Sequence, residues 1–235
     1  MKPRNFFNFS KRNIYSSITK TDGQDEKIYL RINNEIKSFW HDIPYRNPNS
    51  SYNMVVEIPC QSRIIMEMSR NEENNPIMLK KNKVVKNPLT PIRIRDYSKD
   101  PLCNYGFFPQ TYSSKENKFR DLFCGDSDPL DIIQMGGPFN HKPGDIINVN
   151  ILGSFCLIDQ GEMDWKVLVV NSQTDPSNIT EEAIKKMMKW FKIFKTFYGK
   201  KENIILDNNK LFSIAETQQI IEESHQDYLR LMDKH

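Results

Sequence analysis

The sequence lacks any apolar run that approaches the ~18 consecutive residues of a membrane-spanning helix, so we expect no membrane segment. Cysteine is scarce. The four cysteines lie far apart with no C-x-x-C pair, which argues against a zinc site or disulfide framework and favours reduced thiols in an intracellular protein. A large net charge is also missing, because 33 Lys and Arg face 30 Asp and Glu. That near-balance argues against a general nucleic-acid binder.

Acidic residues are missing from the first 21 positions, and the first acid is Asp22. The same stretch contains five basic residues: Lys2, Arg4, Lys11, Arg12 and Lys20. This basic, Ser-containing composition is typical of a mitochondrial presequence, with cleavage expected after Thr21. A disordered basic terminus of a cytoplasmic protein is the alternative. We therefore expect an N-terminal extension, residues 1–21, and a single domain, residues 22–235.

What the sequence does contain indicates one mainly β domain. With 235 residues and 38% hydrophobic residues, the chain can form a substantial core. Short β-rich runs separated by polar loops favour a small barrel or sandwich. The loops are expected at residues 71–75 and 88–91, and the strands at residues 28–32, 52–58, 63–68, 146–152 and 165–170.

Helical periodicity is confined to the end of the chain. Apolar residues recur at helical spacing in residues 180–198, and Gly199 follows as a stop signal. Ser213 and Glu216 form a capping-box pattern that opens a second helix, reaching about Met232. The apolar stripes predict core packing, by Ile184, Met187, Met188, Phe191 and Phe194 in the first helix and Ile220, Ile221 and Tyr228 in the second.

Three carboxylates, Asp126, Asp128 and Asp131, fall within six residues, directly before an apolar pair. Such close negative charges repel one another unless cations neutralise them, and carboxylate oxygens are ligands that Mg²⁺ prefers. An EF-hand loop is excluded, because its sixth and twelfth positions would be Asp131 and Gly137 instead of Gly and Glu. A solvated acidic turn remains the alternative at this point.

A second acidic segment contains Asp159, Glu162 and Asp164, followed by Lys166. It lies between two predicted strands, so a hairpin tip is the simplest interpretation. Two such tips on one barrel would gather four or five carboxylates and more than one divalent cation. A lysine beside them would suit an anionic, phosphate-like substrate.

These motifs, in this order, resemble the soluble family I inorganic pyrophosphatases of the larger eukaryotic type. The D-x-D-P-x-D pattern at residues 126–131 is specific even alone, and the resemblance extends from about residue 39 to residue 231. The other motifs lie at residues 39–44, 53–59, 104–106, 108–111, 159–166 and 190–191.

The resemblance implies an OB-like five-stranded barrel with flanking helices, a homodimer, and Mg²⁺-dependent hydrolysis of pyrophosphate. By position, Asp126, Asp131, Asp159, Asp164 and Glu67 would bind several metal ions. Asp128 would accept a proton from the attacking water, and Glu57 would support the site. Phosphate oxygens would be held by Arg93, Tyr105, Lys166 and Lys195, with Arg95 as an alternative to Arg93.

Two positions depart from the family pattern. Ile65 stands where a phosphate-binding lysine precedes Glu67, and Phe194 replaces the tyrosine of a Tyr-Lys pair. Arg63, two residues before Ile65, could partly substitute if the strand is regular. A hydrogen bond to a charged group contributes about 1.5–3 kcal/mol, so two losses would weaken the enzyme without abolishing it. The departures leave a second function open, a catalytically weak protein of this fold that binds or assembles.

Overall fold

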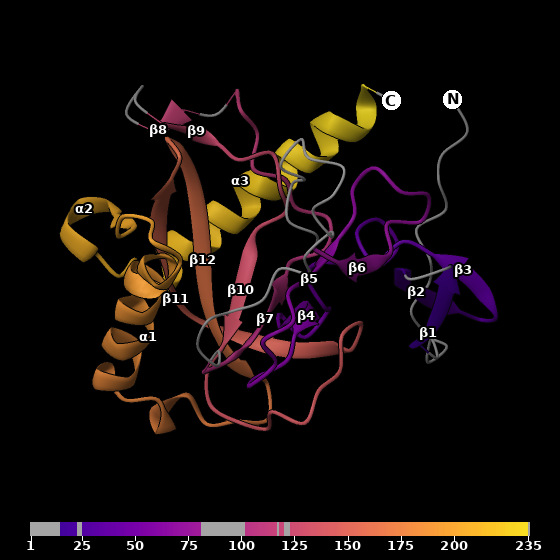
Figure 1. Ribbon diagram of the computed structural model, residues 1–235, viewed down its shortest axis with the longest axis horizontal. Coiled ribbons are helices and arrows are strands. Elements are labelled where there is room, and N and C mark those ends of the chain that lie inside the picture. The colour runs from indigo at the N-terminus through magenta and orange to yellow at the C-terminus, as the bar shows by residue number, and fades with distance from the viewer. Residues whose placement is uncertain (1–14, 23–24, 81–101, 117, 120–122, 235) are drawn as a thin grey trace.

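Five strands close into a barrel that forms the centre of the structure (Figure 1). The computed structural model describes residues 15–22, 25–80, 102–116, 118–119 and 123–234. Around the barrel the strands pair in the order β11–β4–β7–β10–β12 and back to β11; only β10 and β12 run parallel. Their bounds are β4 (Tyr52–Ile58), β7 (Asn104–Phe107), β10 (Asp131–Gln134), β11 (Ile146–Asp159) and β12 (Glu162–Asn171).

This closed ring confirms the mainly β, OB-like five-stranded barrel expected from the sequence. Strand β4 is buried along its whole length, because one side faces the barrel core and the other faces the second sheet. Short strands extend the barrel sheet at both ends: β13 (Ile204–Ile205) beside β11, and β9 (Phe123–Gly125) with β8 (Lys118–Phe119) beside β12.

A second sheet lies beside the barrel, with β1 to β3 on the side away from it (Figure 1). Its strands run in the order β1–β2–β6–β5, with β3 paired to β2. A core cluster that includes Leu30, Phe39, Val55 and Phe107 joins this sheet to the barrel. The strands are β1 (Tyr15–Asp22), β2 (Asp25–Ile32), β3 (Glu35–Lys37), β5 (Met66–Met68) and β6 (Ile77–Leu79).

Strand β1 overlaps the predicted N-terminal extension. Residues 15–22 pair with β2 in an antiparallel hairpin, so the predicted boundary after Thr21 falls inside this strand. Residues 1–14 lie outside the described residues. Cleavage of the extension and the two-part division of the chain therefore stay predictions.

The strand predictions for residues 52–58, 28–32 and 165–170 are confirmed by β4, β2 and β12. The expected strand at 63–68 is wrong in its first half, because β5 begins only at Met66. Strand β11 is longer than expected and continues to Asp159. Residues 71–75 form bends and turns, as expected, whereas the expected loop at 88–91 lies outside the described residues.

Both predicted helices are confirmed. Helix α1 (Glu181–Ile193) is capped by Thr180 and continues as a 3-10 turn (Phe194–Tyr198) that ends at Gly199, whose φ is 72°. Helix α3 (Ile214–Asp233) has the complete capping box and bonds to β11 through Thr217 Oγ1 and Ser154 Oγ, 2.9 Å apart. The structure adds a 3-10 turn (Pro176–Asn178) and a short α2 (Leu206–Asn209).

The helices pack against the barrel through the apolar residues that recur at helical spacing in the sequence. Met187, Met188 and Phe191 of α1 are buried, whereas Ile184 and Phe194 are partly buried against the same cluster. In α3, Ile221 and Tyr228 are buried and Ile220 is partly buried. Among the described residues, no helix combines the length and apolar composition that a membrane crossing requires.

Candidate active site

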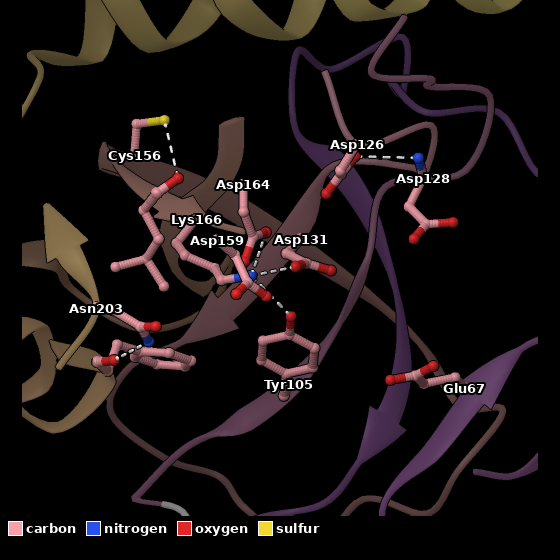
Figure 2. Close-up of polar contacts among 12 residues, drawn as sticks. Glu67, Tyr105, Asp126, Asp128, Asp131, Cys156, Asp159, Asp164, Lys166 and Asn203 are labelled. Carbon is pink, nitrogen blue, oxygen red and sulfur yellow. Dashed lines mark hydrogen bonds and ion pairs between the residues drawn. The ribbon is translucent and has the colours of Figure 1, made fainter. Parts of the chain in front are cut away.

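Strand register places the acidic motifs on one face of the barrel. Asp131 opens β10 and lies directly opposite Lys166 of the parallel strand β12. Asp164 points to the same face as Lys166, because side chains alternate along a strand. Tyr105 of β7 pairs with Ile133, two residues after Asp131, and therefore also shares this face. Three strands thus bring residues from three separate motifs together (Figure 2).

Lys166 is the centre of this group (Figure 2). Its ammonium forms ion pairs with the Asp131 and Asp164 carboxylates and donates to the Tyr105 hydroxyl at 3.1 Å. The side chain is only 5% exposed. Burial alone would lower the pKa of Lys166, but the two carboxylates outweigh it and raise that pKa. The lysine is therefore a fixed cation.

Close backbone packing positions Tyr105. A Cβ added to the next residue, Gly106, would lie 1.8 Å from the carbonyl oxygen of Val55 in β4, so only glycine fits there. This close approach brings β7 against β4. The Tyr105 ring then stacks on Phe191 of α1, with ring centroids 6.1 Å apart.

Asp126 and Asp164 carry the strongest signs of charge crowding. Burial raises the pKa of Asp126 to about 8, with further increases from the charges of Asp164 and Asp131. Burial also raises the pKa of Asp164 to about 7, although Lys166 opposes the shift. Burial, together with the negative charges of the neighbouring carboxylates, thus favours the protonated form of both groups.

Asp128 lies on the loop between β9 and β10, and 60% of its side chain is exposed. Its backbone N–H donates to Asp126 Oδ1 at 3.0 Å (Figure 2), and its Oδ1 forms an ion pair with Arg70 Nε at 2.8 Å. Loss of hydration raises the pKa of Asp128, and the charges of Arg70 and Lys80 oppose that rise. The carboxylate is thus held in place while water can still reach it.

Asp159 and Lys195 form a second pair beside this group. Asp159 ends β11 and pairs with Glu162 across the two-residue hairpin turn, and its carboxylate lies 2.6 Å from Lys195 Nζ. Burial would raise the pKa of Asp159, but Lys195 lowers it. Burial also lowers the pKa of Lys195 and outweighs the attraction of Asp159. The hairpin expected from the sequence is confirmed.

Glu57 and Glu67 approach from β4 and β5. Glu57 is 5% exposed, and its Oε1 accepts a hydrogen bond of 2.6 Å from Met68 N. Burial raises the pKa of Glu57 well above its usual range, and the charge of Glu67 adds to the rise. The carboxylate of Glu67 forms an ion pair with Lys80. Glu57 thus connects the second sheet to the barrel face.

Arg70 and Lys80 are not among the predicted site residues, yet they pair with two of them, Asp128 and Glu67. Lys80 directly follows β6, a strand that the apolar run at residues 77–79 could have indicated. Arg63 lies before β5, so the strand-face argument for it is wrong. Arg93 and Arg95 lie outside the described residues.

The chemistry of this donor set fits hard divalent cations. The negative charge of Asp131 helps to raise the pKa of both Asp126 and Asp164, so a cation among the three carboxylates would relieve their repulsion. Within the described parts of the chain, no three His, Cys, Asp or Glu side chains already meet as a complete ligand group. Instead, the Lys166 ammonium lies between Asp131 and Asp164.

Comparison with known proteins decides the family. The sequence model described as inorganic pyrophosphatase matches residues 54–229. The chain belongs to the inorganic pyrophosphatase family. This membership confirms the resemblance drawn from the motifs, and it accounts for a barrel face that carries both carboxylates and lysines.

Members of the pyrophosphatase family share the sequence and the fold over nearly the whole chain. A probable inorganic pyrophosphatase of Plasmodium falciparum is 31% identical to this chain over an alignment of 264 positions. The alignment covers 96% of this chain and 67% of the relative. A mitochondrial inorganic pyrophosphatase 2 of Mus musculus is 30% identical, over 83% of this chain and 62% of its own. The crystal structure of a type I inorganic pyrophosphatase from Toxoplasma gondii superposes with a TM-score of 0.83 at 28% identity, covering 93% of this chain and all of that one.

Proposed function

We propose that this chain hydrolyses inorganic pyrophosphate to two phosphates with the help of Mg²⁺. The observation that carries the proposal is the convergence of Asp131, Asp164 and Tyr105 on the buried ammonium of Lys166. Carboxylates suit divalent cations, and a fixed ammonium with a hydroxyl suits phosphate oxygens. The cation ligands would be Asp126, Asp131, Asp159, Asp164 and Glu67. Bound cations would acidify a water molecule and neutralise phosphate charge.

Asp128 is the residue that we propose takes the proton. As the oxygen of water bonds to one phosphorus, the bond from that phosphorus to the bridging oxygen breaks. The proton of the water goes to the Asp128 carboxylate, and the bridging oxygen leaves with the second phosphate. Asp128 suits this role because it is exposed, and because Arg70 and the Asp126 carboxylate fix its position.

The lysines and the tyrosine would hold the substrate. Lys166, Lys195 and Tyr105 direct donors toward the acidic face from three different elements. Each would contribute to the alignment of the phosphates, and hydrolysis of a phosphoric anhydride depends mainly on such positioning and on charge neutralisation. We assign Arg93 the same role on the family pattern alone.

Phosphate release tests the function. Purified protein with pyrophosphate and Mg²⁺ should release phosphate, and a chelator should stop it. Asp128→Asn should lower the rate at least about a hundredfold, because general base catalysis contributes about 10²–10⁴-fold. Asp175→Asn is the matched control, because Asp175 is an exposed cap beyond the end of β12, whereas Asp164 and Lys166 lie near its beginning, and asparagine caps equally well. Absence of metal-dependent release from the wild type would overturn the proposal and leave the binding or assembly role.

Assembly and location are further proposals, the first drawn from the family resemblance and the second from the basic composition of residues 1–21. We expect a homodimer, which light scattering on the eluting protein tests. We expect a mitochondrial location with an N-terminus near Asp22 after cleavage, or otherwise a cytoplasmic location. Terminal sequencing of the native protein distinguishes these two.

A further inference from the structure

Strands β5 and β6 place Lys80 directly opposite Ile65. Their antiparallel register pairs Met66 with Leu79 and Glu67 with Met78. The next pair outward is Ile65 with Lys80, and the Lys80 N–H donates to the Ile65 carbonyl at 2.9 Å. Directly opposite residues of an antiparallel pair point to the same face, with Cβ atoms about 4.5–5.5 Å apart. The side chains of Lys80 and Ile65 therefore start from neighbouring positions on the two strands and point to the same face of the sheet.

The Ile65 side chain is part of the hydrophobic core. It is 5% exposed and belongs to the core cluster that contains Ile58 and Cys103. The position where the family pattern has a phosphate-binding lysine is therefore filled by a hydrocarbon side chain. The opposite strand brings an ammonium to this place instead.

The Lys80 ammonium lies at the edge of the proposed site. It forms an ion pair with Glu67, which lies on the diagonal from Lys80 across the two strands. Its charge also acts on the carboxyl groups of Asp128 and Glu57, which belong to two other elements. The Lys80 side chain is 36% exposed, so a ligand can reach the ammonium.

We propose that Lys80 binds a phosphate group of the substrate, in the role that a lysine at position 65 would have. The inference rests on the proposed function, because it concerns the same pyrophosphate site. A divalent cation held by Glu67 would replace the Lys80 ammonium at that carboxylate and would leave the ammonium available to a phosphate oxygen. A lysine on the opposite strand thus compensates for the lysine that is absent at position 65.

Binding of imidodiphosphate, a pyrophosphate analogue with nitrogen in the bridging position, tests the inference by calorimetry in Mg²⁺. Lys80→Met should raise the dissociation constant of the analogue, and the KM for pyrophosphate, by about tenfold to a hundredfold. Lys80→Arg should recover most of the loss. Lys210→Met is the control, because Lys210 is 40% exposed and pairs with Glu216 at 2.7 Å, away from the site. It should change neither constant more than about twofold.

A Glu67→Gln background separates phosphate binding from mere neutralisation of Glu67. Lys80→Met should still weaken analogue binding at least about tenfold there. Unchanged binding in the single variant, or loss of the effect in the Glu67→Gln background, overturns the inference. Wild-type protein that binds the analogue but releases no phosphate contradicts the proposed function alone, and the role of Lys80 is then decided by the dissociation constants.

Discussion

Lys166 lies opposite Asp131 in the one parallel strand pair of the barrel, so its ammonium is fixed between the Asp131 and Asp164 carboxylates. A parallel pair is an unusual element in this ring, whose other pairs are antiparallel. The parallel pairing places Asp131, the last residue of the first acidic motif, beside Lys166, which follows the second acidic motif. The cation that the sequence suggests for phosphate binding is therefore also the counter-ion of two proposed metal ligands.

Removal of this ammonium should destabilise the metal-free protein. Lys166→Met keeps most of the side-chain length but leaves two crowded carboxylates without their shared cation, which should lower the free energy of unfolding by about 3 kcal/mol. Thermal unfolding in a chelator measures the loss, and saturating Mg²⁺ should recover much of it. The control is Lys185→Met, because the Lys185–Glu181 pair at 2.6 Å is exposed and should contribute under about 1 kcal/mol. Equal losses in both variants would contradict the prediction.

The stability of the metal-free protein should fall as pH rises from about 5.5 to about 8.5. The pKa values of Asp126 and Asp164 are raised to about 8 and about 7, against about 3.9 for an unfolded Asp. In this interval the folded chain binds more protons than the unfolded chain, so the free energy of unfolding decreases with pH. Each extra proton contributes about 1.4 kcal/mol per pH unit, held over about 2.5 units by Asp126 and about 1.5 units by Asp164, so we expect a total loss of up to about 5 kcal/mol.

Melting curves in a chelator at several pH values check this dependence. Mg²⁺ should abolish the decline, because the cation takes the place of the protons and binds more tightly as they leave. The buried Glu57 acts in the same direction, since its pKa is also raised. A metal-free protein that grows more stable over this interval would disprove the crowding of charge at the site.

The barrel could be predicted because its longest strands carry local signals. Residues 52–58 are rich in β-forming residues throughout, which predicts β4. The Gln160–Gly161 turn joins two apolar runs, which predicts the β11–β12 hairpin. Strands β7 and β10 have only four residues each, and their pairing depends on contacts between distant segments. Periodicity cannot resolve such short strands.

The carboxylates of the site and two of its lysines, Lys166 and Lys195, were predicted, whereas the basic partners of Asp128 and Glu67 were not. The D-x-D-P-x-D motif identifies three carboxylates within one short segment, but Asp128 pairs with Arg70, two residues after β5, and Glu67 pairs with Lys80, directly after β6. Lys80 reaches Glu67 only through the register of two three-residue strands. Register is set by pairing in the folded sheet, so sequence spacing alone could not place this lysine.

Restoration of the family lysine at position 65 should harm the protein. Ile65→Lys would put an ammonium into the cluster around Ile58 and opposite Lys80, so we expect a loss of about 2–4 kcal/mol and no faster phosphate release. Ile64→Lys is the control, because Ile64 is 48% exposed and should change stability by under about 0.5 kcal/mol. Denaturant unfolding and phosphate release measure both effects. A stable and faster Ile65→Lys protein would support decay of the site instead.

Restoration of the tyrosine at position 194 should help. The Phe194 ring stacks on Trp190, with centroids 5.2 Å apart and an angle of 5° between the planes, and it directly precedes Lys195. Phe194→Tyr keeps this ring stack and adds a hydroxyl beside a proposed phosphate-binding lysine. We expect the KM for pyrophosphate to fall about threefold to tenfold, with stability changed by under about 1 kcal/mol. Phe194→Leu controls for the ring, since it should lower stability through lost stacking and should not lower KM. If Phe194→Tyr leaves KM unchanged, the position does not face the substrate.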